Sequence, residues 1–199
     1  MNITFVDRNL EFIHAIEDIF PKKTVSTFCG DIFKIEAQAL VSPANSFGFM
    51  DGGIDQVYTD RFGGIVQESL QNNIKEMNFG EILVGQATHV CVDDPVYEYI
   101  IVAPTMRVPK RLPDSINIRL AFRAALDEAN WLEVQSIVFP GMGTGVGGVN
   151  PKTAAYEMLR GYMDFYAPKP FPVSIQAAMR DEDIYKIGTF GGKTYEKRM

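Results

Sequence analysis

Apolar residues along the chain occur either in short runs or at helical spacing. Mainly apolar runs at residues 3–6, 25–29, 39–41, 99–103, 136–139 and 173–177 predict strands, and weaker patterns predict two more at 82–84 and 87–91. Apolar residues that recur every three or four positions predict helices over residues 12–20, 54–77, 116–129 and 154–165. Gly63 and Gly64 interrupt the second of these helices, so this stretch forms either one broken helix or two short ones.

The order of these elements predicts the fold class. Ser115 is a candidate cap for the third helix, and Asn150 followed by Pro151 is a favourable start for the fourth. Strands that alternate with helices indicate an α/β fold, in which helices cover both faces of a sheet. Because no linker or repeat is visible, we expect residues 1–199 to form a single domain with a polar tail at 181–199.

Composition and charge narrow the function classes. The chain has 199 residues, of which 46% are hydrophobic, and a net charge of −6, so it can bury a full core. No apolar run is long enough for a membrane span, no secretory signal is readable, and two cysteines make no disulfide framework, so we expect a cytoplasmic protein. The acidic balance disfavours duplex nucleic acid as a partner, and the short basic cluster Arg107, Lys110 and Arg111 is interpreted as a solvated loop edge.

Several reactive side chains are interpreted as structural. His14 and His89 have no companion ligand at metal spacing, so no metal site and no cofactor are predicted. Cys29 and Cys91 lie in strand patterns and are expected to be buried. The only tryptophan, Trp131, is expected in the core.

Glycine is concentrated in two segments. Of 17 glycines, five lie within residues 48–64 and five within 141–148. The first segment, VSPANSFGFMDGGID at 41–55, leaves a predicted strand at its carboxyl end, where ligands bind in open α/β sheets. Its polar residues Asn45 and Asp55 are candidate ligand contacts, but the same residue types are also ordinary turn and helix-cap residues.

The second segment, at 137–159, consists of a buried strand, a glycine-rich loop and a capped helix. Backbone N–H groups in such a loop, next to a helix N-terminus, can bind phosphate. The segment lacks the acidic partner of the dinucleotide-binding fingerprint, and Val149 stands where a P-loop requires lysine. Phosphate binding is therefore the preferred interpretation, with a tight strand-to-helix turn as the alternative.

Four short motifs together resemble the macrodomain family. They are GDI at 30–32, PAN at 43–45, GGID at 52–55 and GTGVGG at 143–148, in the family's order. The resemblance covers roughly residues 25–180 and implies a three-layer α/β/α sandwich with a mixed, mostly parallel sheet. Residues 1–24 then form a strand and helix added to the family core.

The resemblance also implies a ligand, ADP-ribose, and a role for each matching residue. Asp31 and Ile32 would contact the adenine, and Met179 would pack against it. Gly53 and Ile54 would face one side of the diphosphate, and Gly143, Thr144, Gly145, Val146 and Gly147 the other. Asn45 would bind the distal ribose, and Asp55 would lie near its anomeric carbon, so these two residues are the candidate catalytic pair.

Three functions remain open at this stage, one of them an interaction protein that reuses the fold. The resemblance, together with the carboxylate of Asp55, suggests hydrolysis of an ADP-ribose derivative, either an ADP-ribosyl ester or ADP-ribose 1″-phosphate. However, Ser42 and Pro43 replace the family's usual Asn and Ala, and Gly147 replaces an aromatic residue found in many members. These departures suggest the alternative of a non-catalytic module that reads ADP-ribose.

Overall fold

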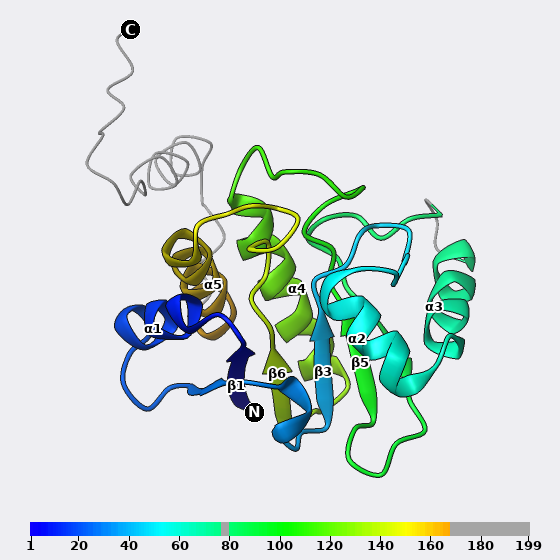
Figure 1. The fold of residues 1–199 in the computed structure, drawn as a ribbon, viewed down its shortest axis with the longest axis horizontal. Coiled ribbons are helices and arrows are strands. Elements are labelled where there is room, and N and C mark those ends of the chain that lie inside the picture. Colours follow the sequence, from blue (N-terminus) through cyan, green and yellow to red (C-terminus); the bar gives the residue numbers. More distant parts are fainter. Residues whose placement is uncertain (77–79, 168–199) are drawn as a thin grey trace, which may run out of the picture. The chain divides into compact units, whose positions relative to one another are not determined.

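A six-stranded sheet forms the centre of the protein (Figure 1). The structure is a computed structural model, and it describes residues 1–76 and 80–167. The strand order is β2-β1-β6-β3-β5-β4, and every neighbouring pair is parallel except β4 with β5. The strands are β1 (Asn2–Asp7), β2 (Ser26–Cys29), β3 (Ala39–Ser42), β4 (Thr88–Cys91), β5 (Tyr99–Val102) and β6 (Ser136–Phe139). The prediction of a mixed, mostly parallel sheet is confirmed.

Helices cover both faces of this sheet, as the three-layer prediction requires. Alternate residues of β3 and β6 point to opposite sides: Val41 and Phe139 join one apolar cluster, and Leu40 and Val138 join the other. The first cluster also takes side chains from α1 (Leu10–Ile19), α4 (Ile116–Trp131) and α5 (Pro151–Tyr166). The second takes them from α2 (Gly53–Phe62), α3 (Ile65–Glu76) and the short 3₁₀ helix η1 (Ile32–Lys34).

Most predicted elements are present. Gly63 ends α2 with a positive φ, so of the two alternatives for this stretch the structure has two short helices, α2 and α3. Two local expectations are wrong. Residues 82–84 form no strand; Val84 makes only an isolated bridge to Gln86. Ser115 makes no capping bond to α4, because the carboxylate of Asp114 accepts the Ile116 N–H at 3.0 Å instead.

Three expectations of burial are also wrong. Cys29 and Cys91 are exposed because they lie on β2 and β4, the two edge strands of the sheet. Trp131, in the last turn of α4, is 71% exposed. The strand predicted at residues 173–177, Met179 and the tail at 181–199 lie outside the described residues.

The first strand occupies an interior position of the sheet. β1 pairs with β2 on one side and with β6 on the other. Its Phe5 is fully buried and contacts four other phenylalanine rings: Phe12 of α1, Phe20 at the C-cap of α1, Phe122 of α4 and Phe139 of β6. That residues 1–24 are an addition to the family core stays a prediction, but they are integral to this sheet.

No helix within residues 1–76 and 80–167 combines the length and apolar character needed to cross a membrane.

Candidate ligand-binding cleft

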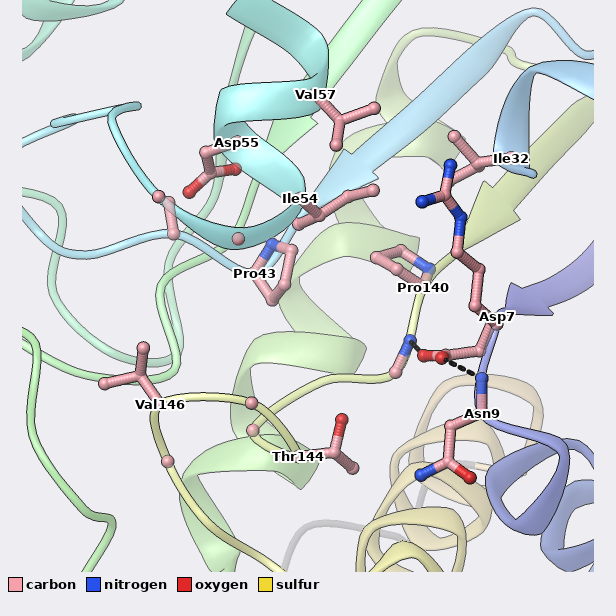
Figure 2. Close-up of a pocket in the computed structure, with 18 of the residues that line it drawn as sticks. Asp7, Asn9, Ile32, Pro43, Ile54, Asp55, Val57, Pro140, Thr144 and Val146 are labelled. Atoms are coloured by element: carbon pink, nitrogen blue, oxygen red, sulfur yellow. Dashed lines mark hydrogen bonds between the residues drawn. The ribbon is translucent and has the colours of Figure 1, made fainter. Parts of the chain in front are cut away.

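A cleft of about 620 Å³ opens at the carboxyl ends of β1, β2, β3 and β6. Crevices at this edge are the usual ligand sites of open α/β sheets. Five segments line it: residues 6–9, 30–32, 43–57, 106–109 and 140–147. Figure 2 shows side chains from the first, second, third and last of these segments converging on the same space.

The cleft brings together the site residues predicted from sequence. All of those that the structure describes line it: Asp31, Ile32, Asn45, Gly53, Ile54, Asp55, Gly143, Thr144, Gly145, Val146 and Gly147. Met179 lies outside the described residues. The role of each of these residues depends on the hydrogen bonds that it makes.

The N-terminus of α2 opens into the cleft without a cap. Gly52 occupies the N-cap position and offers no side-chain acceptor. The N–H groups of Gly53, Ile54 and Asp55 have no hydrogen-bond acceptor among the described residues. Since the first N–H groups of a helix attract negative charge, this end of α2 can bind an anion.

The second glycine segment forms a loop on the other side of the cleft. Two backbone bonds shape it: Gly148 N–H donates to Gly145 O at 2.9 Å, and Val149 N–H donates to Gly143 O at 3.0 Å. The N–H groups of residues 143–147 donate to no acceptor in the described parts of the chain. Two sets of unused donors, from α2 and from this loop, therefore line one cleft.

The glycines of this loop differ in whether the fold requires them. A Cβ atom at Gly147 would lie 2.5 Å from Gly143 O, so the fold excludes a side chain there. At Gly145 a Cβ would meet no atom within 4 Å, and its φ is not in the left-handed region. Neither packing nor conformation within the described residues requires glycine at 145.

Asp31 lines the cleft next to Ile32, whose side chain lies across the cleft from Val146 in Figure 2. Its Oδ1 caps η1 by accepting the Phe33 N–H at 3.0 Å. Its Oδ2 lies 3.6 Å from the guanidinium of Arg8, whose side chain is 75% exposed. Each oxygen of Asp31 can accept a further hydrogen bond, and the apolar side chains of Ile32, Ile54 and Val57 line the same cleft.

Asn45 is buried and bonded within its own loop. Its Oδ1 accepts the N–H groups of Phe47 and Phe49, at 3.1 and 3.3 Å, and its Nδ2 donates to Phe49 O at 2.8 Å. Only one N–H of the amide has no partner in the described residues. The main role visible for Asn45 is to hold the loop that precedes α2.

Asp55 is the buried carboxylate of the cleft. It lies in the first turn of α2 and is 8% exposed, and its Oδ1 accepts the Ser42 hydroxyl at 2.5 Å. Burial raises the pKa of the Asp55 carboxyl to about 6; the Ser42 bond opposes this rise, and the charge of Asp51 adds to it. Asp55 is therefore mainly ionised at neutral pH and close to its titration range.

Sequence reasoning missed Asp7. Its carboxylate, at the end of β1, accepts the N–H of Asn9 at 2.8 Å and the N–H of Gly141 at 3.0 Å (Figure 2). The available signal was the same one that identified the other loops: a polar residue directly after a predicted strand. Contact with a residue 134 positions away could not be inferred from that signal.

The described residues thus form a three-layer α/β/α domain with two sets of unused amide donors at one edge of its sheet. The Macro domain family model matches residues 41–158, which is more than half of the chain. The chain belongs to the Macro domain family.

Relatives and solved structures agree with this assignment. A protein of Aquifex aeolicus is 37% identical over 130 residues, covering 65% of this chain and 75% of the relative. The ADP-ribose glycohydrolase MACROD1 of Bos taurus is 28% identical over 172 residues, covering 81% of this chain and 50% of the relative. The Oceanobacillus iheyensis macrodomain with ADP has a TM-score of 0.60 at 20% identity and covers 78% of this chain and 87% of its own. The macrodomain of Mycobacterium tuberculosis DarG has a TM-score of 0.59 at 20% identity, with 68% and 87% covered. These structural matches show a shared fold.

Proposed function

We propose that the protein binds ADP-ribose in the cleft. The adenine lies beside Asp31 and Ile32, and the diphosphate lies between the α2 N-terminus and residues 143–147. The distal ribose lies near Asn45 and Asp55. The observation that carries this proposal is the pair of unused backbone donor sets on two sides of one cleft.

The side chains of the cleft provide little positive charge for this ligand. Four aspartates line it, whereas Arg8 is the only Lys or Arg among the lining residues. A diphosphate in this cleft therefore depends on backbone N–H groups and the α2 dipole rather than on cationic side chains. Asp31 provides an acceptor for the exocyclic amine of adenine, which a phosphate site alone would not need.

Gly145→Val tests the binding proposal. The new side chain meets no protein atom within 4 Å of its Cβ, so the free energy of unfolding stays close to that of the wild type, while the side chain fills the space assigned to the diphosphate. We expect at least a tenfold loss of ADP-ribose affinity in calorimetry.

The matched control is Gly64→Val, between α2 and α3, where a Cβ also meets no atom within 4 Å but which does not line the cleft. Equal ADP-ribose affinities for the two variants would contradict the proposed place of the diphosphate.

We further propose that the protein hydrolyses an ADP-ribose derivative, an ADP-ribosyl ester or ADP-ribose 1″-phosphate. The carboxylate of Asp55, with a pKa of about 6, is suited to orient a water and to accept its proton at neutral pH. Negative charge near the anomeric carbon also stabilises a cation-like transition state.

A turnover assay on both substrates tests this reaction. Asp55→Ala is expected to reduce kcat at least a hundredfold with a smaller change in KM, because the proposed role of the carboxylate is in the reaction rather than in holding the nucleotide. Wild-type turnover in Asp55→Ala would exclude this mechanism.

A non-catalytic ADP-ribose reader is the second candidate. It is favoured by the bonds of Asn45, which are directed to its own loop, and by the Ser42 hydroxyl that occupies Asp55 Oδ1. Calorimetric binding of ADP-ribose without turnover of either substrate would select the reader over the hydrolase.

A further inference from the structure

Asp7 lies where three segments of the cleft meet. Its main-chain carbonyl accepts the N–H of Gly30 at 2.9 Å, and Gly30 directly precedes Asp31. Its Oδ1 accepts the N–H of Asn9, the N-cap residue of α1, and its Oδ2 accepts the N–H of Gly141, where the glycine loop begins. One residue of β1 thus bonds to three segments that line the cleft, at Asn9, Gly30 and Gly141.

The Asp7 carboxylate links β1 to the chain after β6 at the point where the backbone pairing of these two strands ends. The last aligned pair between β1 and β6 is Phe5 with Phe139. Pro140 follows, and because proline has no N–H, it cannot donate to a ladder bond. Gly141 is the next donor along the chain, and the Asp7 carboxylate accepts from it. A Cβ at Gly141 would lie 2.5 Å from Asp7 Oδ2, so glycine permits this approach.

We propose that Asp7 is a positioning residue for the glycine loop, through which it keeps the N–H groups of residues 143–147 directed at the ligand's diphosphate. This inference rests on the proposed binding of ADP-ribose. Both hydrogen bonds of the Asp7 carboxylate are to backbone N–H groups, those of Asn9 and Gly141, so the proposed role of Asp7 is to hold Gly141.

Loss of the Asp7 charge and loss of its bond to Gly141 are expected to change the affinity for a dianionic ligand in opposite directions, which makes the inference testable. An aspartate in a cleft that binds a dianion repels it, so removal of the charge alone raises affinity. Loss of the Gly141 bond lowers affinity, because the loop amides are no longer held in place. The side chain of Asp51 also lines the cleft but makes no hydrogen bond to another described residue, so Asp51→Asn reports the charge effect alone.

The experiment measures ADP and adenosine affinities by calorimetry for the wild type, Asp7→Asn, Asp7→Glu and Asp51→Asn. Asparagine offers one oxygen for two N–H groups, and glutamate keeps the charge but moves it by one methylene. We expect both Asp7 variants to bind ADP about tenfold more weakly, with little change for adenosine, and Asp51→Asn to bind ADP as tightly as the wild type or more tightly. ADP affinities of the Asp7 variants that match Asp51→Asn overturn the inference.

Amide hydrogen exchange at Gly141, Gly148 and Val149 provides a readout that needs no ligand. Exchange is expected to be faster in both Asp7 variants than in the wild type and Asp51→Asn; unchanged exchange overturns the inference. If Asp7→Asn does not fold, Asp7→Glu against Asp51→Asn decides. If the wild type binds neither ADP nor adenosine, the proposed function fails, and the exchange rates still test the role of Asp7.

Discussion

At the scale of single residues, side-chain oxygens in the cleft accept hydrogen bonds from the protein itself, whereas two sets of backbone N–H groups in the cleft have no acceptor among the described residues. Asp7 and Asn45 direct their side-chain oxygens at backbone N–H groups of the surrounding loops. The N–H groups of residues 53–55 and 143–147 have no acceptor in the described chain. The polar side chains therefore shape the cleft, and the backbone supplies the donors proposed to bind the anion.

Asp55 offers a prediction that separates stability from function. Its pKa in the folded protein is about 6, above the ordinary value, so folding favours the protonated carboxyl. The protonated Asp55 carboxyl contributes about 3 kcal/mol to the free energy of unfolding. This contribution is complete below about pH 4 and is lost as the pH rises through about 6, so it is absent at neutral pH. Asp55→Asn is expected to unfold at higher urea concentration than the wild type at pH 7.5.

The comparison is repeated at pH 4, where the difference between variant and wild type should shrink toward zero. Asp51→Asn, at an exposed position of the same cleft, serves as the control and should show a smaller gain at pH 7.5, because the charge of Asp51 is the smallest of the causes that act on the pKa of Asp55. A stability gain that is the same at both pH values would show that titration of Asp55 is not its cause.

The site residues found from sequence share one property: each belongs to a short motif next to a strand or helix end. Gly53 and Gly145 could be predicted because glycine-rich turns at strand ends have local signatures. The Ser42–Asp55 bond and the Asp7–Gly141 bond could not, because a bond between residues 13 or 134 positions apart depends on packing of the sheet.

At the scale of elements, the periodicity of apolar residues predicted the helices well and the edge strands less well. α3 and α5 bury one face each, so their spacing is clear. β2 and β4 lie at the edges of the sheet, where burial is incomplete, so Cys29 and Cys91 are exposed although their strands were predicted. Residues 82–84 have an apolar pattern but no strand partner.

The crossing of α4 and α5 depends on Gly161. A Cβ at this position would lie 2.9 Å from the main-chain carbonyl oxygen of Arg119 on α4. Gly161→Val is therefore expected to reduce the free energy of unfolding by about 1–3 kcal/mol, since the two helices must move apart. Urea unfolding measures the loss, and Met163→Val, at a 56% exposed position of the same helix, is the control. Equal stabilities of the two variants would contradict close packing at Gly161.

At the scale of the whole molecule, the first strand joins the two halves of the sheet edge that carries the cleft. β1 separates β2, which leads to Asp31, from β6, which leads to the glycine loop. Residues 1–24 are therefore expected to be needed for folding as well as for the cleft, even though the family model begins at residue 41.

Deletion of residues 1–24 tests this expectation. It removes Phe5 and Phe12 from the apolar cluster and leaves β6 without one of its two parallel neighbours. We expect a protein without a cooperative thermal transition and without ADP-ribose binding, measured by calorimetry. A truncated chain that unfolds cooperatively and binds ADP-ribose with wild-type affinity would show that these residues are dispensable.

The sequence by itself determined the alternation of strands and helices, the glycine-rich segments at strand ends and their resemblance to one family, because local spacing and turn chemistry encode these features. The tertiary structure decided which residues face one another. It placed β1 inside the sheet, bonded Asp7 to Gly141 and Ser42 to Asp55, and brought the amides of residues 53–55 and 143–147 into one cleft. The physical reason is that the pairing order of parallel strands depends on long-range packing, which the pattern within any one segment does not specify.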